Sequence, residues 1–211
     1  MSKIKNIVFD LGGIIFEIDK NRAIEHFKEV GFADAKSYLD AFTQVGIFGQ
    51  LEAGQITAEE FRSELSKLAG KEMTLEDCYH GWTGYYKQMH QYILDAVLDL
   101  RARGYRVSLL SNTNPYMMQW ARSNDFDGNG HPVDYYFDKL YLSYECKVMK
   151  PDARIFEMML EGENAKPEET IFIDDSPHNV KAAAELGIHT LQPANGEDWR
   201  EMLEEALNKD Y

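Results

Sequence analysis

The chain has 211 residues, of which 44% are hydrophobic and 27% are charged, and it carries a formal net charge of −14. That length suits one large domain or a core domain with an insertion. The acidic balance argues against nucleic acid and anionic membranes as partners. No apolar run approaches the roughly 18 residues of a membrane helix, no signal segment is evident, and Cys78 and Cys146 make no disulfide framework. We therefore expect a cytoplasmic protein.

Short apolar runs recur along most of the chain and predict strands. The strongest candidates are Ile4–Phe9, Arg106–Leu110 and Ile171–Asp174, and weaker ones are Leu140–Leu142 and His189–Leu191. Their apolar residues mostly do not alternate with polar ones, which is typical of strands that are covered on both faces of a sheet.

Helical patterns separate these runs. Four are evident, at Tyr92–Arg103, around Ile155–Leu160, at Pro177–Leu186 and at Trp199–Leu207. A glycine follows each of the first three and predicts the helix end there, at Gly104, Gly162 and Gly187. Strands that alternate with helices predict an α/β fold with a parallel, doubly wound, Rossmann-like sheet.

Residues 17–90 interrupt this alternation and look helical throughout, without a convincing strand. Ala23, Ile24 and Phe27 form an apolar stripe, and the residues from Thr57 to Glu60 form a capping box that opens a helix. We expect a helical cap of residues 17–90, inserted after the first strand into a Rossmann-like core of residues 1–16 and 91–211.

Carboxylates end two of the predicted strands. Asp10 follows Ile7-Val8-Phe9, and Asp174 and Asp175 follow the strand that starts at Ile171. Ligands of open α/β sheets bind outside the carboxyl ends of the strands, so these acids are expected to meet. Three adjacent carboxylates repel one another unless a cation neutralises them, which favours a hard divalent metal. The alternative is that one of the two later acids caps the helix near Pro177.

Polar residues follow the other strands. Ser111 and Asn112 come after Val107–Leu110 and can hold phosphate oxygens, unless they form only a polar turn. Lys150 precedes Pro151, and a lysine there can neutralise phosphate and nearby carboxylates. Lys147 is a competitor, and Lys150 is preferred because Pro151 fixes the chain beside it.

Together, in this order, these sites resemble the haloacid dehalogenase (HAD) superfamily of phosphohydrolases. The matching stretches are IVFDLGGII, LLSNTN, KPDARIF and IFIDDSPHNVKAAAELG, and the resemblance spans the whole chain, including the helical cap. The pattern is most similar to the bacterial sugar-phosphate phosphatases, including glucose-1-phosphatase-like proteins.

The resemblance implies a nucleophile and a metal site. Asp10 would attack phosphorus and form an aspartyl-phosphate. Mg²⁺ would bind Asp10, the backbone carbonyl of Gly12 and Asp175, with Asp174 as a direct or water-mediated ligand. The implied activity is Mg²⁺-dependent hydrolysis of a small phosphorylated metabolite, and a sugar phosphate is the expected substrate class.

The resemblance also implies which residues bind the phosphoryl group. Ser111 would hydrogen-bond the transferring group, helped by the backbone amide of Asn112. Lys150 would offset negative charge on the nucleophile and on the phosphate. The displacement is then stabilised by cations and by aimed hydrogen-bond donors.

One position departs from the family pattern. Most phosphatases of the superfamily carry a second aspartate two residues after the nucleophile as general acid and base, and here that residue is Gly12. The leaving group can be one that needs little protonation, such as an anomeric sugar oxygen; a cap residue or water can substitute; or the enzyme can be slow. The cap candidates are Asp19, Asp40, Glu52 and His80.

Two further readings stay open. A 2-haloacid dehalogenase also lacks the second aspartate, but its last motif is less acidic and it generally lacks the metal. The other is a non-catalytic phosphosugar-binding protein, for which Gly12 is the only support in the sequence. In the cap, Trp82 and Tyr85 can stack on a sugar ring or fill the cap core, and Arg22 can contact phosphate or form a hinge ion pair.

Overall fold

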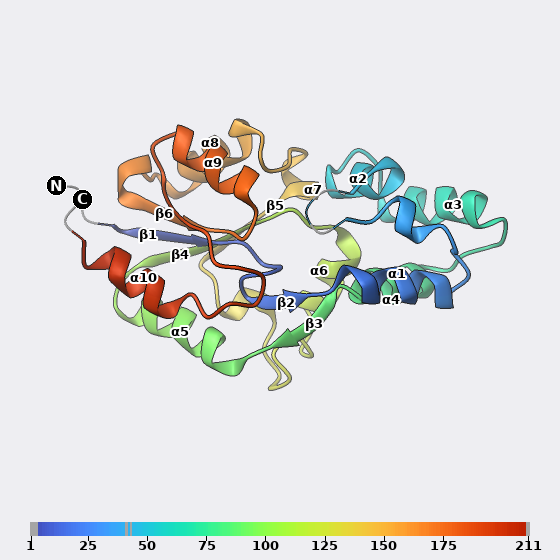
Figure 1. The fold of residues 1–211 in the computed structure, drawn as a ribbon, viewed down its shortest axis with the longest axis horizontal. Helices are drawn as coiled ribbons and strands as arrows, with labels where there is room; N and C mark the ends of the chain where they lie inside the picture. Colours follow the sequence, from blue (N-terminus) through green and yellow to red (C-terminus); the bar gives the residue numbers. More distant parts are fainter. Residues whose placement is uncertain (1–3, 41, 43, 210–211) are drawn as a thin grey trace.

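The computed structural model describes residues 4–40, 42 and 44–209, and within them it shows a five-stranded parallel sheet in the order β5-β4-β1-β6-β7 (Figure 1). The strands are β1 (Asn6–Phe9), β4 (Arg106–Ser111), β5 (Lys139–Leu142), β6 (Thr170–Ile173) and β7 (His189–Leu191). All five predicted strands are therefore confirmed to within one or two residues at their ends. The parallel α/β class is confirmed with them.

Helices cover both faces of the sheet. Alternate residues of each strand point to opposite faces, so Ile7 and Phe9 of β1 belong to one apolar cluster and Val8 to another. Helices α5 (Gln91–Ala102) and α10 (Arg200–Leu207) pack on the first face, and α8 (Ala153–Glu163) and α9 (Pro177–Glu185) on the second (Figure 1). Burial on both faces explains why the strands are apolar without alternation.

The predicted helices are present, and one predicted end is wrong. Helix α8 continues through Gly162 and ends at Asn164, which adopts the left-handed conformation with φ +50°. A Cβ added at Gly162 would lie 2.3 Å from the hydroxyl of Tyr141. The glycine therefore permits close packing of the helix on β5 and does not end the helix.

Shorter elements complete the core. Helix α6 (Pro115–Ala121) follows β4, and α7 (Ser143–Cys146) follows β5. Among the described residues, 3₁₀ turns lie at Val133–Tyr135 and Pro167–Glu169 in the core, and at Ala35–Ser37 outside it.

A second, two-stranded antiparallel sheet lies where the chain leaves and re-enters the core. It pairs β2 (Phe16–Ile18) with β3 (Tyr86–Met89). These strands contradict the prediction that residues 17–90 contain no strand. Each has only three or four residues, and partners such as Phe16 and Met89 are far apart in the chain, so no local pattern announces them.

The residues between these strands, 19–85, are here called the insertion. They contain α1 (Lys20–Glu29), α2 (Gly46–Glu52), α3 (Ala58–Ala69) and α4 (Leu75–Thr83), and they lie beyond the carboxyl ends of the sheet strands (Figure 1). The predicted capping box at Thr57 and Glu60 is present, and the stripe of Ala23, Ile24 and Phe27 is buried.

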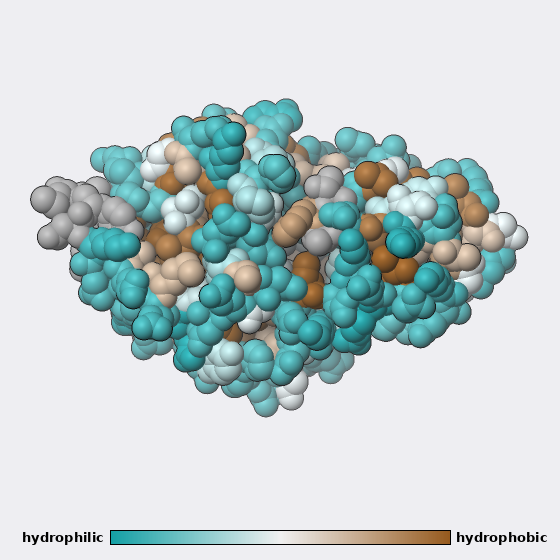
Figure 2. All heavy atoms as spheres, viewed as in Figure 1, coloured by the Kyte–Doolittle hydropathy of each residue, from teal (hydrophilic) through white to brown (hydrophobic). Residues whose placement is uncertain are grey.

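An aromatic cluster forms the centre of the insertion. The Trp82 ring lies 5.4 Å from Phe48 and 6.0 Å from both Phe27 and Phe61, measured between ring centroids. Figure 2 shows that hydrophilic residues cover most of the visible face and that apolar residues form small, separate patches. Among the residues that the structure describes, no helix combines the length and apolar character needed to cross a bilayer.

Gly81 sets how closely α1 and α4 approach. A Cβ at this position would lie 2.4 Å from the ring of Phe27. Gly81→Ala should therefore lower the free energy of unfolding by about 1–3 kcal/mol through overpacking, although alanine normally favours a helix. Urea unfolding measures the change. Leu75→Ala, on the same helix with half its surface exposed, should change stability by at most about 0.5 kcal/mol, and an equal loss in both variants would contradict the packing argument.

Candidate active site

Three carboxylates meet at the ends of β1 and β6. The two strands are parallel neighbours with Phe9 opposite Ile173, so the residues that follow them emerge side by side. One carboxylate oxygen from each of Asp10, Asp174 and Asp175 lies within 4.8 Å of the other two. The predicted cluster of acids therefore forms, and its hard oxygen donors suit a divalent cation such as Mg²⁺.

Lys150 is the cation that the fold supplies to this cluster. Its ammonium lies 2.9 Å from Asp10 Oδ1 and 2.6 Å from Asp174 Oδ2, and it donates to the carbonyl of Leu110 at 2.8 Å. The side chain is fully buried. Burial lowers the pKa of Lys150, but Asp10 and Asp174 more than offset this, so its pKa is raised and it stays charged. Lys147, the competing candidate, is exposed.

The side chain of Asn112 fixes the backbone at Lys150. Its Oδ1 accepts the Lys150 N–H at 2.8 Å, and its Nδ2 donates to the Lys150 carbonyl at 2.9 Å. The sequence analysis gave Asn112 only a backbone role. The two residues are 38 positions apart, and nothing in either local stretch signals the pairing.

Asp174 and Asp175 face different ways. Asp174 is fully buried and accepts hydrogen bonds from the Ser176 N–H at 2.8 Å and from Asn179 Nδ2 at 3.0 Å, in addition to Lys150. It lies just before α9 without being its N-cap, which is Ser176. Asp175 instead lines the cleft described below. Asn179 was missed by the sequence analysis.

The turn after Asp10 brings the backbone close to Asp175. Gly13 has φ +85°, and a Cβ there would lie 2.5 Å from Asp175 Oδ2, so only glycine fits. Gly12 lines the cleft without a side chain. Ser111 also lines the cleft, and its hydroxyl makes only a long 3.4 Å contact with the Asn112 carbonyl among the described residues.

Burial and mutual repulsion raise the pKa of two of the acids. The pKa of Asp10 is raised to about 7, chiefly by burial; the charge of Lys150 opposes this, and Asp174 and Asp175 add to it. The pKa of Asp175 is raised to about 6 by burial and by Asp174, against Lys150. One lysine thus does not neutralise the cluster, which leaves room for a further cation.

A cleft of about 690 Å³, including the part open to solvent, adjoins the cluster. Asp10, Ser111 and Asp175 lie on the sheet side, and the insertion contributes the opposite wall, with Phe42, Gln44, Glu52, Trp82 and Tyr85. Trp82 fills the insertion core, as one of the two predictions has it, and it also lines the cleft. Its buried Nε1 has no hydrogen-bond partner among the described residues, so it can donate to a ligand.

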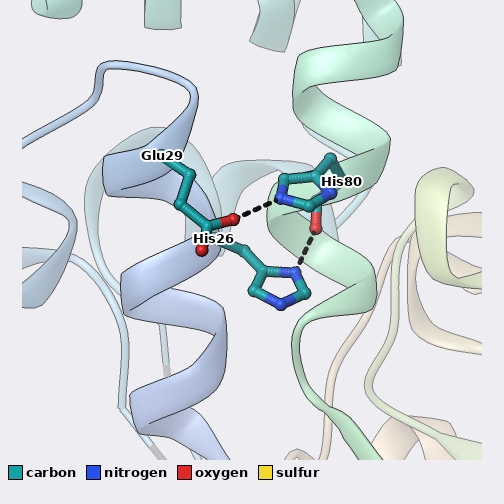
Figure 3. Close-up of side chains that lie close together, drawn as sticks. All are labelled: His26, Glu29 and His80. Atoms are coloured by element: carbon teal, nitrogen blue, oxygen red, sulfur yellow. Dashed lines mark hydrogen bonds and ion pairs between the residues drawn. The ribbon is translucent and has the colours of Figure 1, made fainter.

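Of the four insertion residues proposed to replace an acid at Gly12, Glu52 is the one that lines the cleft as far as the structure describes it. Asp19 caps α1 through the Asn21 N–H at 2.9 Å, and Asp40 pairs with Lys20 at 3.4 Å. His80 lies 2.8 Å from Glu29 on the α1–α4 surface (Figure 3).

Arg22 forms no ion pair with any residue that the structure describes, so the hinge ion pair is not seen there. Its guanidinium donates to the carbonyl of Tyr86 at 2.9 Å and so ties the start of α1 to β3.

Comparison with known proteins agrees with this geometry. The family model described as haloacid dehalogenase-like hydrolase matches residues 4–187, and the chain belongs to that family. It is 46% identical over 97% of its length to a D-ribitol-5-phosphate phosphatase from Bacteroides thetaiotaomicron, of which it covers 99%.

Solved structures are similar over nearly the whole chain. A HAD-like family hydrolase from Porphyromonas gingivalis superposes with a TM-score of 0.93 at 41% identity, covering 99% of this chain and 100% of that one. A HAD family enzyme from Bacteroides thetaiotaomicron, in complex with magnesium and inorganic phosphate, gives 0.86 at 41% identity over 94% and 98%.

The charge of Lys150 should matter more as the pH rises. An aspartate whose pKa is raised on folding, as for Asp10 from 3.8 to about 7, contributes stability at low pH that is lost as the pH rises through 7. Lys150→Met removes the cation that opposes this loss. At pH 8 without metal we expect it to lower the free energy of unfolding by about 3 kcal/mol or more, and by less at pH 5.

Urea unfolding at the two pH values measures this difference. Lys147→Met is the matched control, because this lysine is exposed nearby, and it should have little effect at either pH. A Lys150→Met loss that is the same at pH 5 and pH 8 would argue against repulsion among the carboxylates.

Proposed function

We propose that this protein is a Mg²⁺-dependent phosphomonoesterase that acts on a small phosphorylated polyol or sugar through an aspartyl-phosphate. The observation that carries the proposal is the cluster of Asp10, Asp174 and Asp175 beside the buried Lys150, with Asp10 and Asp175 at the wall of a cleft. The similarity to a ribitol-phosphate phosphatase and to an enzyme that binds magnesium and phosphate supports it.

The residues have separate tasks in this proposal. Asp10 is the nucleophile, and its carboxylate, the Gly12 carbonyl and Asp175 would hold Mg²⁺. The metal would supply charge neutralisation when bound. Asp174 would act on the metal indirectly, because both of its oxygens already accept hydrogen bonds from protein donors.

Phosphate binding falls to the sheet side of the cleft. The Ser111 hydroxyl and the Asn112 N–H would donate to the phosphoryl oxygens. Lys150 has three acceptors for its three N–H groups, at Asp10, Asp174 and Leu110. It therefore acts as a fixed positive charge that lowers the repulsion between nucleophile and phosphate.

The insertion is proposed to select the substrate. We assign residues 17–90 as a cap and residues 1–16 and 91–211 as the catalytic core. The cap wall combines apolar rings with polar groups such as Gln44 and the free Trp82 N–H, which suits a molecule that carries hydroxyl groups on a carbon chain.

The dehalogenase and binding-protein alternatives fit the site less well. Halide displacement needs no divalent cation, yet the described acids here outnumber the one lysine that neutralises them. A binding protein would not require a carboxylate that lines the cleft and is paired with a buried lysine.

Replacement of the nucleophile should abolish activity. Asp10→Asn keeps the size of the side chain but removes its nucleophilic charge, so turnover of phosphate esters should fall below detection. EDTA should have the same effect, reversed by excess Mg²⁺. Phosphate release measures both, and Asp99→Asn, on the exposed side of α5, should retain full activity. Turnover by Asp10→Asn would refute the nucleophile assignment.

A panel of phosphate esters tests the substrate class. We expect ribitol 5-phosphate and related open-chain phosphates to be substrates, since the cleft is small and its cap wall is polar in part. Their turnover should occur with Mg²⁺ and not without it. Phosphate release across polyol, anomeric and sugar 6-phosphates gives the ranking. Absence of activity on every small ester would contradict the proposal.

A further inference from the structure

Glu52 is a buried carboxyl group on the cap wall of the cleft. It is the last residue of α2, only 6% of it is exposed, and it lines the same cleft as Asp10. No lysine or arginine among the described residues forms a salt bridge with it. A buried carboxyl without a cation is costly to ionise, and such a group in a cleft is a candidate functional residue.

The surroundings of Glu52 favour its protonated form. Burial raises its pKa to about 8; the side-chain amide of Asn114 opposes this, and the charge of Asp10 adds to it. Among the described residues, Tyr85 also interacts with it, and the pKa of Tyr85 is raised well above the usual range by burial and then by Glu52. Near pH 7 Glu52 is therefore a protonated carboxyl group on the cap wall of the cleft.

The sheet side of the cleft cannot supply that proton. Gly12 has no side chain, and Asp10 and Asp175 belong to the acid cluster. On the cap wall, the Tyr85 hydroxyl already donates its proton to the carbonyl of Asp40 at 2.9 Å. We propose that Glu52 is the catalytic general acid and base that replaces the carboxylate missing at Gly12. This assignment rests on the proposed phosphatase function.

The proton balance follows directly. In the first step Asp10 attacks phosphorus, the bond from phosphorus to the ester oxygen breaks, and that oxygen takes the proton of Glu52 and leaves as an alcohol. In the second step water attacks the aspartyl-phosphate, Glu52 takes one proton from the water, and the bond to Asp10 breaks. Inorganic phosphate leaves, and both carboxyl groups regain their starting states.

The same assignment bears on the three explanations for Gly12. An anomeric leaving group is not needed if the insertion carries its own acid. An unactivated alcohol, such as the primary oxygen of a polyol phosphate, then becomes an ordinary substrate.

The test compares leaving groups in Glu52→Gln, which is isosteric and keeps the uncharged form. With ribitol 5-phosphate, kcat/KM should fall by about 10²–10⁴-fold, the usual worth of general acid catalysis. With 4-nitrophenyl phosphate, whose leaving group departs as a stable anion, the burst of nitrophenolate should persist. The steady state after the burst should be slow, because the water lacks its base.

Two further readouts separate catalysis from structure. The wild-type rate on ribitol 5-phosphate should fall as the pH rises above about 8, and the residual rate of Glu52→Gln should lack that fall. Formate should partly restore Glu52→Ala. Glu59→Gln, an exposed change on α3, should match wild type throughout.

The outcomes are distinct. An undiminished kcat/KM in Glu52→Gln, or an equal loss of the burst and of ribitol 5-phosphate turnover, overturns the assignment of Glu52 and leaves the phosphatase function intact. Wild-type protein that releases no phosphate from either ester overturns both.

Discussion

The contact of one buried lysine with two buried aspartates is the constraint on which the rest of the site depends. Lys150 reaches Asp10 and Asp174 only because β4, β1 and β6 are neighbours in the sheet and end at the same edge. Asn112 holds the lysine backbone, and Asn179 holds Asp174. Residues from four segments of the chain thus satisfy the polar network. Replacement of any one of these residues leaves a buried charge without compensation.

Much of this arrangement could be predicted from the sequence. Buried parallel strands leave continuous apolar runs, and the carboxylates and the hydroxyl lie at the ends of those runs, as at Asp10 and Ser111. Parallel topology then brings these strand ends together without further information. The capping box at Thr57 and the stripe through Phe27 were equally legible, because both depend on residues three or four positions apart.

What the sequence could not reveal depends on distant pairs or on burial. Strands β2 and β3 form only because they meet, and each is too short to show a period. The side chain of Asn112 looks like part of a turn until its partner is known. Glu52 could not be ranked above Asp19 or His80, since all three are polar residues of the insertion and only its packing distinguishes the buried Glu52 from the half-buried Asp19 and His80.

Both chain crossings into the insertion run through the narrow ribbon of β2 and β3, which Arg22 ties to α1. A rotation about that ribbon would move the whole insertion as a rigid unit relative to Asp10, which lies at the end of β1. In the proposed mechanism, the nucleophile Asp10 and the proton donor Glu52 therefore lie on opposite sides of this hinge. With the insertion rotated away from the core, a phosphorylated Asp10 would lack the base that activates water. In the proposed mechanism the alcohol could then depart before hydrolysis begins, and each turnover would need the insertion to close twice.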